Sequence, residues 1–224
     1  MSSHHIVREK QEPALIIANG EACSLELLHQ LLEWSPFVVV LDGAIERVLS
    51  LGIKVDVLFG DFDDLVFSLD EIKQSQFPIE IIHAPDQEKT DLEKAIEFLI
   101  QRGHPAVNIT WATGRRADHT IANISNLAKY AESIKIKMLD DHSIIYPILP
   151  LPNVFIKWFK AHSTISLIPI FEAKGIVTKN LKYALLNEDL RLGFRIGNSN
   201  EALSDGNVEI SFESGGMLIM ECSD

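Results

Sequence analysis

The stretch Val55–Asp63, with the sequence VDVLFGDFD, joins a short apolar run to a turn that carries two carboxylates. A continuous run of Val, Leu and Phe predicts a strand that is buried on both faces, as in a parallel sheet covered by helices. In open sheets of this kind, ligands bind beyond the carboxyl ends of the strands. The stretch therefore predicts an α/β fold, and it places the chemistry at the turn that follows the strand.

The sequence on both sides of this stretch repeats the same pattern. Four further apolar runs rich in Val and Ile are Ala14–Ala18, Phe37–Leu41, Ile79–His83 and Val107–Ala112. The segments between the runs place apolar residues three and four positions apart, which predicts amphipathic helices. The longest such set is Leu92, Ala95, Ile96, Leu99 and Ile100. Alternating strands and helices predict an open, mostly parallel sheet with helices on both faces.

The last third of the sequence has a pattern that is typical of strands and turns. Val208, Ile210 and Phe212 alternate with polar residues, as in a half-buried strand. Turn signals recur at Lys179-Asn180, Asp205-Gly206 and Gly215-Gly216. We therefore expect a small all-β domain after the α/β domain.

The change of pattern near Asp141–Tyr146 predicts a domain boundary. It gives an α/β domain over residues 1–142 and a β domain over residues 143–224. Three prolines just after the boundary fit a connection or an edge strand. They are Pro147, Pro150 and Pro152.

The composition is that of a folded protein and excludes two classes of partner. Of the 224 residues, 46% are hydrophobic and 23% are charged, which is enough apolar material for a core. The net charge of −12 opposes binding to nucleic acid, because phosphate contacts need clustered Lys and Arg. It equally opposes binding to an anionic membrane. Such a charge can also serve solubility alone.

The cysteines and the N-terminus favour a cytoplasmic location. Cys23 and Cys222 lie far apart and form no Cys-x-x-Cys pair, which fits a reduced protein. Met1–Gln11 is polar and charged, unlike a signal peptide. No apolar run approaches the roughly 18 residues of a membrane span.

Carboxylates follow the third predicted strand directly. Asp61 and Asp63 stand two positions apart in a turn that Gly60 begins. Two carboxylates in this arrangement can share a hard divalent cation such as Mg²⁺ and leave coordination positions for water and phosphate. The alternative is a solvated turn that caps a helix.

The segment after the fourth predicted strand combines a helix start with a lysine. Thr90 to Glu93 have the form of a capping box, in which Thr90 is the N-cap and Glu93 reaches back to it. Lys89 and the free N–H groups of such a helix end can bind phosphate. Asp91 can ligate a metal or can complement the helix dipole.

Two arginines follow the fifth predicted strand. Arg115 and Arg116 are succeeded by Asp118 and His119 in an otherwise acidic protein, and guanidinium groups suit phosphate oxygens. Asn123 lies about one helical turn further along. The alternative is an ordinary surface ion pair.

Several nucleotide-binding and hydrolytic motifs are absent from the sequence. It contains no Gly-x-x-x-x-Gly-Lys-[Ser/Thr] and no Gly-x-Gly-x-x-Gly, and it has neither a Gly-x-Ser-x-Gly nor a His-Glu-x-x-His motif. What remains is Mg²⁺–phosphate chemistry without a P-loop.

These elements, in this order, resemble the thiamine pyrophosphokinase family over roughly Ala14 to Met220. The matching α/β motifs are Asp42-Gly43-Ala44, Gly60-Asp61-Phe62-Asp63, Asp86-x-Glu88-Lys89-Thr90-Asp91, and Gly114-x-Arg116-x-Asp118-His119 with Asn123. The matching motifs in the β-rich part are Gly175-Ile176-Val177-Thr178 and Ser199-Asn200-Glu201. Each motif alone is weak, but the ordered set is specific.

The resemblance implies a Rossmann-like α/β domain followed by a β-sandwich. It also implies a homodimer whose active site lies between the α/β domain of one subunit and the β domain of the other. The implied activity is transfer of the pyrophosphoryl group of ATP to the hydroxyl of thiamine, which gives thiamine diphosphate and AMP. Mg²⁺ is the implied cofactor and ATP the co-substrate.

The resemblance also assigns roles by position. The residues implied to hold Mg²⁺ are Asp61, Asp63 and Asp91, which together with Arg116 form the implied catalytic set. The residues implied to contact the nucleotide are Asp42, Lys89, Thr90, Arg116, Asp118 and His119. The residues implied to bind the substrate thiamine are Ser199, Asn200 and Asn123.

The sequence departs from the family pattern at three positions. Asp64 stands where Ser is usual, Arg115 where Gly is frequent, and Tyr183 where Trp is common. We expect Tyr183 to belong to the core of the β domain.

Two other functions remain as alternatives. They are a pyrophosphokinase for another small alcohol, such as a hydroxymethyl pterin, and a non-catalytic nucleotide- or thiamine-binding protein. The presence of all three acids of the metal set counts against the second alternative.

Overall fold

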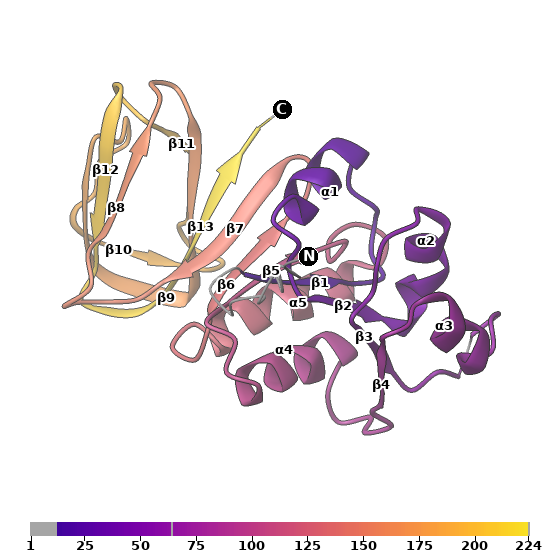
Figure 1. The fold of residues 1–224 in the computed structure, drawn as a ribbon. Helices are drawn as coiled ribbons and strands as arrows, with labels where there is room; N and C mark the ends of the chain where they lie inside the picture. Colours follow the sequence, from indigo (N-terminus) through magenta and orange to yellow (C-terminus); the bar gives the residue numbers. More distant parts are fainter. Residues whose placement is uncertain (1–12, 64, 224) are drawn as a thin grey trace.

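A computed structural model describes residues 13–63 and 65–223, and in it helices alternate with strands only in the first part of the chain (Figure 1). The helices are α1 (Leu25–Leu32), α2 (Ile45–Ser50), α3 (Leu69–Ser75), α4 (Asp91–Gln101) and α5 (Ala117–Lys129). The first six strands are β1 (Ala14–Ile17), β2 (Val38–Leu41), β3 (Val57–Gly60), β4 (Glu80–His83), β5 (Ala106–Thr110) and β6 (Lys135–Leu139). The later strands are β7 (Ser143–Ile148), β8 (Phe155–Phe159), β9 (Thr164–Lys179), β10 (Leu186–Arg191), β11 (Gly197–Glu201), β12 (Gly206–Ser211) and β13 (Ser214–Cys222).

The α/β part is a parallel sheet with the order β4-β3-β2-β1-β5-β6. The five apolar runs of the sequence form β1 to β5, so the strand predictions are confirmed to within a few residues. Strand β6 was not predicted. In its alternating sequence Lys-Ile-Lys-Met only Ile136 and Met138 are buried, so β6 lacks the continuous run of apolar residues that marks β1 to β5.

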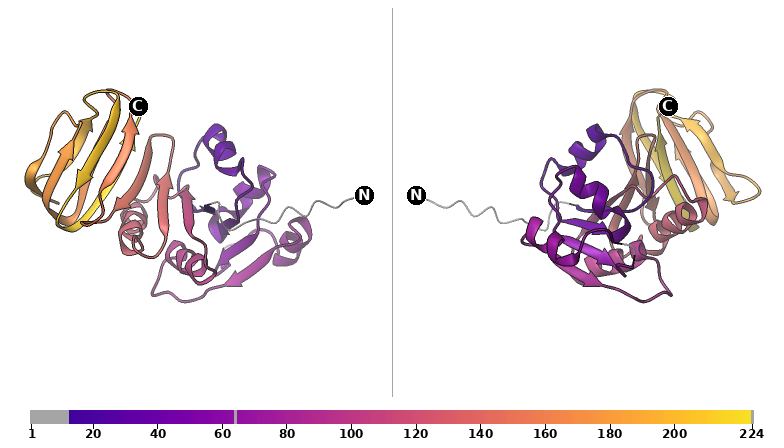
Figure 2. Two further views of the ribbon diagram at one scale, coloured as in Figure 1. Left: turned by 60° about the vertical axis from the view of Figure 1, so that its left-hand side comes forward. Right: turned by 90° about the vertical axis from the view of Figure 1, so that its right-hand side faces the viewer.

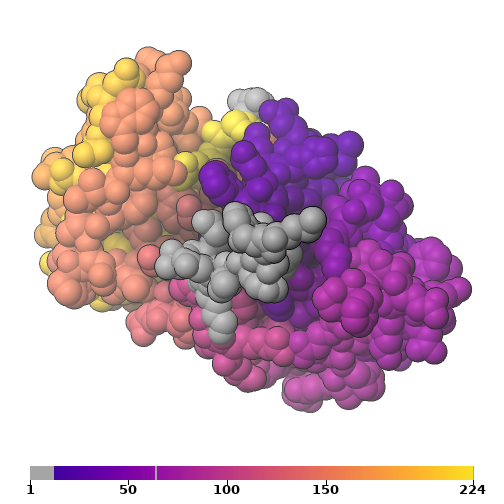
Figure 3. Space-filling view, viewed as in Figure 1, coloured from indigo at the N-terminus to yellow at the C-terminus, as the bar shows by residue number. Residues whose placement is uncertain are grey.

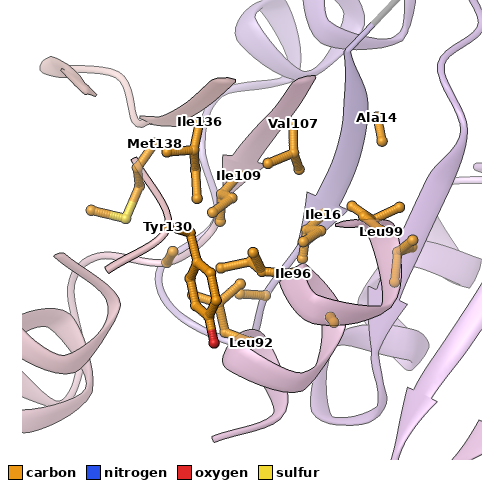
Figure 4. Packing of buried hydrophobic residues seen from close by; sticks show 14 of the residues in the cluster. Ala14, Ile16, Leu92, Ile96, Leu99, Val107, Ile109, Tyr130, Ile136 and Met138 are labelled. Carbon is orange, nitrogen blue, oxygen red and sulfur yellow. The ribbon is translucent and has the colours of Figure 1, made fainter. Parts of the chain in front are cut away.

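Helices cover both faces of this sheet because alternate residues of each strand point to opposite sides. Ile16 belongs to a cluster with residues of α4 and α5, whereas Leu15 and Ile17 belong to a cluster with residues of α1, α2 and α3. Figure 4 shows the first cluster, in which Leu92, Ile96 and the other apolar positions of α4 pack on the central strands. The predicted spacing of α4 is therefore confirmed.

The boundary near residue 142 is not a linker. Strands β6 and β7 form a tight antiparallel turn, in which the N–H of Asp140 donates to the carbonyl of Ser143 at 3.0 Å. The sheet then continues through β7, β13, β9, β12 and β8, while β10 and β11 pair with β9. Pro147 lies in β7 beyond the two residue pairs that join it to β6, so its missing N–H leaves no gap in that ladder.

The β-rich part confirms most of the predicted alternation. Val208, Ile210 and Phe212 are buried and face a second core that also holds residues of β9 and β13. Tyr183 is 61% exposed, so the expectation that it belongs to this core is wrong. Leu181, two positions earlier in the sequence, is buried in the core of the β-rich part instead.

The predicted turn at Gly215-Gly216 is also wrong. Both glycines lie inside β13, where the register against β9 shifts. A Cβ on Gly215 would come within 2.1 Å of the carbonyl oxygen of Glu172. The glycine therefore marks a bulge, where the two backbones approach closely, rather than a chain reversal.

Figure 2 shows the strands of the C-terminal part standing beside the α/β part, with the two linked through β6 and β7. The end of β13 lies against α1, as the yellow and indigo surfaces of Figure 3 show. A shallow cavity of about 460 Å³ lies there, lined among others by Leu27 and Cys222. Within the described ranges, no helix is long and apolar enough to cross a membrane.

Candidate functional site

A cleft of about 590 Å³ lies at the carboxyl ends of β1 to β5, and the segments that follow all five strands line it. The predicted site residues in its lining are Asp42, Asp61, Lys89, Thr90, Asp91, Arg116, His119 and Asn123. Of the part of the chain that is described, Asp63, Asp118, Ser199 and Asn200 do not line it. The parallel strands therefore bring together most of the residues that lie far apart in the sequence.

Asp42 and Gly60 fit together at the centre of the acidic wall. The carboxylate of Asp42 accepts the backbone N–H of Phe62 at 3.0 Å and that of Gly43 at 2.6 Å. A Cβ on Gly60 would lie 2.2 Å from the Oδ2 of Asp42. Glycine at the end of β3 is thus what allows the Asp42 side chain to sit across the neighbouring strand end.

The acids of this wall influence one another's charge. Burial raises the pKa of Asp42, and the negative charges of Asp91 and Asp61 raise it further. The pKa of Asp61 is lowered instead, chiefly because the side-chain amide of Gln87 donates to its Oδ2 at 3.2 Å. The backbone N–H of Asp63 lies 3.4 Å from the other oxygen of Asp61. This wall concentrates negative charge and therefore favours a cation.

Asp91 already has a cationic neighbour. The Nζ of Lys94 lies 2.7 Å from the Oδ1 of Asp91 and also donates to the carbonyl oxygens of Ala84 at 2.6 Å and Asp86 at 3.0 Å. The Lys94 side chain is only 10% exposed. It therefore fastens the start of α4 to the segment that follows β4.

The predicted helix cap at Thr90 is confirmed in one half and wrong in the other. Thr90 is the N-cap of α4, and its hydroxyl accepts the N–H of Glu93 at 3.3 Å. The carboxylate of Glu93 does not reach back to Thr90. It accepts Lys129 Nζ at 2.5 Å and the Tyr130 hydroxyl at 3.3 Å, so it joins α4 to the end of α5.

Lys89 lines the cleft but is held by an acid. Its Nζ lies 2.8 Å from both carboxylate oxygens of Glu97, which also accepts the hydroxyl of Tyr130 at 2.7 Å. The Lys89 ammonium lowers the pKa of Glu97, and Glu97 in turn raises the pKa of Lys89. Lys89 therefore stays charged while Glu97 binds its ammonium group.

The opposite wall of the cleft is basic and begins helix α5. Arg116 is the N-cap residue and forms a two-point pair with Asp118, with Nε to Oδ1 at 3.1 Å and Nη2 to Oδ2 at 2.5 Å. This pairing lowers the pKa of Asp118 to about 2 and raises the pKa of Arg116. Asp118 thus orients Arg116 rather than facing the cleft.

Two further arginines, Arg47 and Arg115, meet at Asn19, directly after β1. Arg47 donates to the Asn19 side-chain oxygen at 2.9 Å and to the Gly20 carbonyl at 3.1 Å. Its guanidinium carbon lies 4.6 Å from the centre of the buried Trp111 ring. Arg115 donates to the main-chain oxygen of Asn19 at 3.1 Å.

The predicted thiamine residues lie in two separate places. Asn123 is 8% exposed in α5, and its amide donates to the carbonyl of Ala112 at 2.8 Å, which fixes α5 to the end of β5. Ser199 and Asn200 lie on β11. The amide of Asn200 is buried and bonds to the backbone N–H and carbonyl of Tyr183, at 3.0 and 2.9 Å. Ser199 is exposed.

The metal set is only partly assembled. Asp61 and Asp91 face the same cleft, whereas the Asp63 side chain is exposed outside it. Across residues 13–63 and 65–223, no three His, Cys, Asp or Glu side chains gather closely enough to hold an ion. The donor chemistry nevertheless fits Mg²⁺, since Asp42, Asp61 and Asp91 bring carboxylate oxygens to one cleft. Asp64 lies outside the described residues.

Sequence reasoning missed several side chains of the cleft. Asn19 and Gln87 were not singled out, although both follow predicted strands and the rule that located the other residues applies to them equally. Lys94 could have been found from its place three residues after Asp91, on the same face of α4.

Comparison with known proteins identifies both parts of the chain. The model of the thiamin pyrophosphokinase catalytic domain matches residues 28–138, and that of the thiamin pyrophosphokinase vitamin B1 binding domain matches residues 155–217. A thiamine pyrophosphokinase of Bacillus subtilis is 27% identical over 185 residues, which cover 82% of this chain and 86% of that protein. Thiamin pyrophosphokinase 1 of Caenorhabditis elegans is 25% identical over 212 residues, covering 88% and 84%.

A solved structure agrees at the level of the fold. The crystal structure of thiamine pyrophosphokinase from Bacillus subtilis superposes on this chain with a TM-score of 0.80 at 24% sequence identity. The superposition covers 95% of this chain and 100% of the other. The order of motifs, the cleft and both family models lead to the same conclusion: the chain belongs to the thiamin pyrophosphokinase family.

Proposed function

We propose that this chain transfers the pyrophosphoryl group of ATP to the hydroxyl of thiamine, giving thiamine diphosphate and AMP. The observation that carries the proposal is the cleft, in which the carboxylates of Asp42, Asp61 and Asp91 line one cavity together with Lys89 and Arg116, whose side chains are of types that bind phosphate. The match to both a catalytic and a vitamin-B1-binding family model supports the two substrates. No observation favours another alcohol or a non-catalytic role.

The reaction is a displacement at the β-phosphorus of ATP. The thiamine hydroxyl oxygen forms a bond to this phosphorus, the bond from it to the oxygen shared with the α-phosphorus breaks, AMP leaves with that oxygen, and the hydroxyl proton is released. Because charge shifts onto phosphoryl oxygens, catalysis by this chain is positioning and charge stabilisation. Arg116 and Lys89 supply the positive charge from opposite walls of the cleft.

Asp61 and Asp91 would hold Mg²⁺, with Asp63 adjacent to Asp61. When bound, the ion neutralises phosphate charge and orients the polyphosphate. Lys94 and Gln87 then act as positioning residues, because they already hold Asp91 and Asp61 in the cleft wall.

We further infer that the chain divides by function at residue 142. Residues 1–142 form a Rossmann-like half that binds nucleotide and metal, and residues 143–224 form a sandwich-like half that contributes to the thiamine site and the dimer interface. The ranges of the two family models support this division, and so does the second apolar cluster, whose residues all come after residue 142. The unpaired cysteines Cys23 and Cys222 support a cytoplasmic location.

The test of the activity is an assay with ATP, Mg²⁺ and thiamine in which both products are quantified. Equal amounts of AMP and thiamine diphosphate are expected. ADP with thiamine monophosphate would mean transfer of a single phosphoryl group and would overturn the proposal. Tight thiamine diphosphate binding without turnover would establish the non-catalytic alternative.

The proposed dimer explains why Ser199 and Asn200 lie on β11, outside the cleft lining. In a homodimer, the β11 segment of one subunit would complete the cleft of the other. Mixing an Asp61→Asn variant with a Ser199→Trp variant would restore about a quarter of wild-type activity, because half of the dimers are mixed and each holds one intact site. Recovery of no activity on mixing, with both variants dimeric by ultracentrifugation, would place the whole site within one subunit.

A further inference from the structure

Arg115 has a backbone conformation that an arginine adopts only at some cost. Its φ is +52°, in the left-handed region that favours glycine, and it directly follows Gly114 at +71°. Such an outlier at a cleft points to a function that compensates for the strain. Arg115 lines the cleft of the proposed active site, and its side chain reaches across to the end of β1.

Arg47 makes the surroundings of Arg115 unusually positive. Burial lowers the pKa of Arg47, and the charge of Arg115 lowers it further, while Glu21 only partly opposes them. The two guanidiniums share Asn19, whose side-chain oxygen lies 2.9 Å from Arg47 Nη2 and 3.4 Å from Arg115 Nη1. Two like charges held together in a protein of net charge −12 are stabilised when an anion binds between or beside them.

Arg115 has donors to offer that Arg116 does not. Arg116 already uses its Nε–Nη2 edge to bind Asp118. Within residues 13–63 and 65–223, hydrogen bonds are found for Arg115 only through Nη1, to Asn19. A guanidinium has five N–H groups, so those of Nε and Nη2 are available to a planar pair of acceptors such as two phosphate oxygens.

From these contacts we infer that Arg115 is a specificity-determining residue that binds the polyphosphate of the nucleotide, held in place by Asn19, which Arg47 binds in turn. The inference rests on the proposed function for the identity of the nucleotide. The basic corner of Asn19, Arg47 and Arg115 reaches the cleft through Asn19 and Arg115, which line it together with Asp61 and Asp91. It therefore orients the phosphate chain between a positive and a negative wall.

The test compares Arg115→Gln with Arg102→Gln, a matched variant that removes the same charge at the C-terminal end of α4, where Arg102 pairs with Glu80. Binding of a non-hydrolysable ATP analogue, AMP and adenosine is measured by calorimetry, together with the KM values for ATP and thiamine. Arg115→Gln is expected to weaken the ATP analogue about tenfold, as for the loss of one charge-assisted hydrogen bond. Adenosine binding, the KM for thiamine and all values for Arg102→Gln are expected to stay unchanged.

Arg115→Gly is the second variant, and its folding is not in question because glycine favours a φ of +52°. It is expected to keep or raise the melting temperature while losing ATP-analogue affinity to the same extent. Wild-type affinity for the ATP analogue in both variants would overturn the inference, and so would an equal loss of adenosine binding. A wild-type protein that binds the ATP analogue but forms no AMP and thiamine diphosphate would overturn the proposed function alone.

Discussion

The Nζ of Lys94 lies 2.7 Å from the Oδ1 of Asp91, three residues earlier on the same helix. One of the three acids assigned to Mg²⁺ is thus held by a lysine whose other hydrogen bonds go to main-chain oxygens of the preceding segment. The pair fixes the direction of the Asp91 carboxylate before any ligand arrives. Such preorganisation is what charge stabilisation in a phosphate site requires.

Lys94→Met is expected to lower the free energy of unfolding by about 1–3 kcal/mol, because it leaves Asp91 and two carbonyl oxygens without their donor. Urea denaturation measures the change. The control is Lys73→Met, whose ammonium lies 4.0 Å from Asp70 on the exposed face of α3, and it is expected to change stability by less than about 0.5 kcal/mol. Equal losses in the two variants would show that the buried pair contributes no more than an exposed one.

Asp61→Asn is expected to reduce kcat by at least about 10²-fold while the fold survives, because the carboxylate lies at the cleft and makes few structural contacts. Steady-state kinetics and circular dichroism measure the two effects. Asp70→Asn, with a side chain that is 91% exposed, removes the same charge elsewhere and should leave kcat unaltered. A wild-type rate for Asp61→Asn would mean that the assignment of this residue to the metal is wrong.

Gly60→Ala is expected to destabilise the protein by about 1–3 kcal/mol and to displace Asp42, since the new Cβ would meet its Oδ2 at 2.2 Å. The same substitution in an Asp42→Ala background tests the cause through a double-mutant cycle. If the contact with Asp42 is responsible, Gly60→Ala has a much smaller effect there. An unchanged effect would place the cause in the backbone of β3.

Glu97→Gln is expected to make the stability of the protein depend less on pH below neutrality. The Lys89 ammonium and then the Tyr130 hydroxyl hold the pKa of Glu97 below its usual value of 4.5. A lowered folded-state pKa stabilises the protein above the unfolded value, and the contribution is lost as pH falls through the folded value. Melting temperatures of wild type and Glu97→Gln should therefore differ most near neutral pH and converge as the pH falls below the usual value of 4.5.

The exposed residue Glu132, just after α5, gives the control for this curve as Glu132→Gln. Its melting temperatures should run parallel to those of the wild type. A gap between wild type and Glu97→Gln that stays constant with pH would show that the Glu97 charge is not what stabilises the contact between α4 and α5.

Local patterns in the sequence were sufficient to predict strands β1 to β5 and the position of the cleft at their carboxyl ends. Runs such as Val55–Phe59 can be buried only in a sheet covered on both faces, and parallel strands bring their carboxyl ends to one edge. Asp42, Asp61 and Asp91 could therefore be placed together without knowledge of any long-range contact. Their meeting depends on the sheet order alone.

What the sequence could not reveal depends on partners that lie far away along the chain. Glu93 has the spacing of a capping box, yet Lys129 and Tyr130 bind its carboxylate from the end of α5. Gly215 has the form of a turn, yet it marks close contact with the backbone of Glu172. In each case a local propensity is overridden by a tertiary neighbour.

The ladder of hydrogen bonds that runs from β6 through β7 to β13 has a mechanical consequence. Two domains on a flexible linker can swing together around a substrate, but a shared sheet resists bending at that point. Leu218 of β13 packs in the core of the α/β part, which stiffens the joint further. Hinge closure between the two parts of this chain is therefore not available, and heating is expected to unfold both parts in a single cooperative transition.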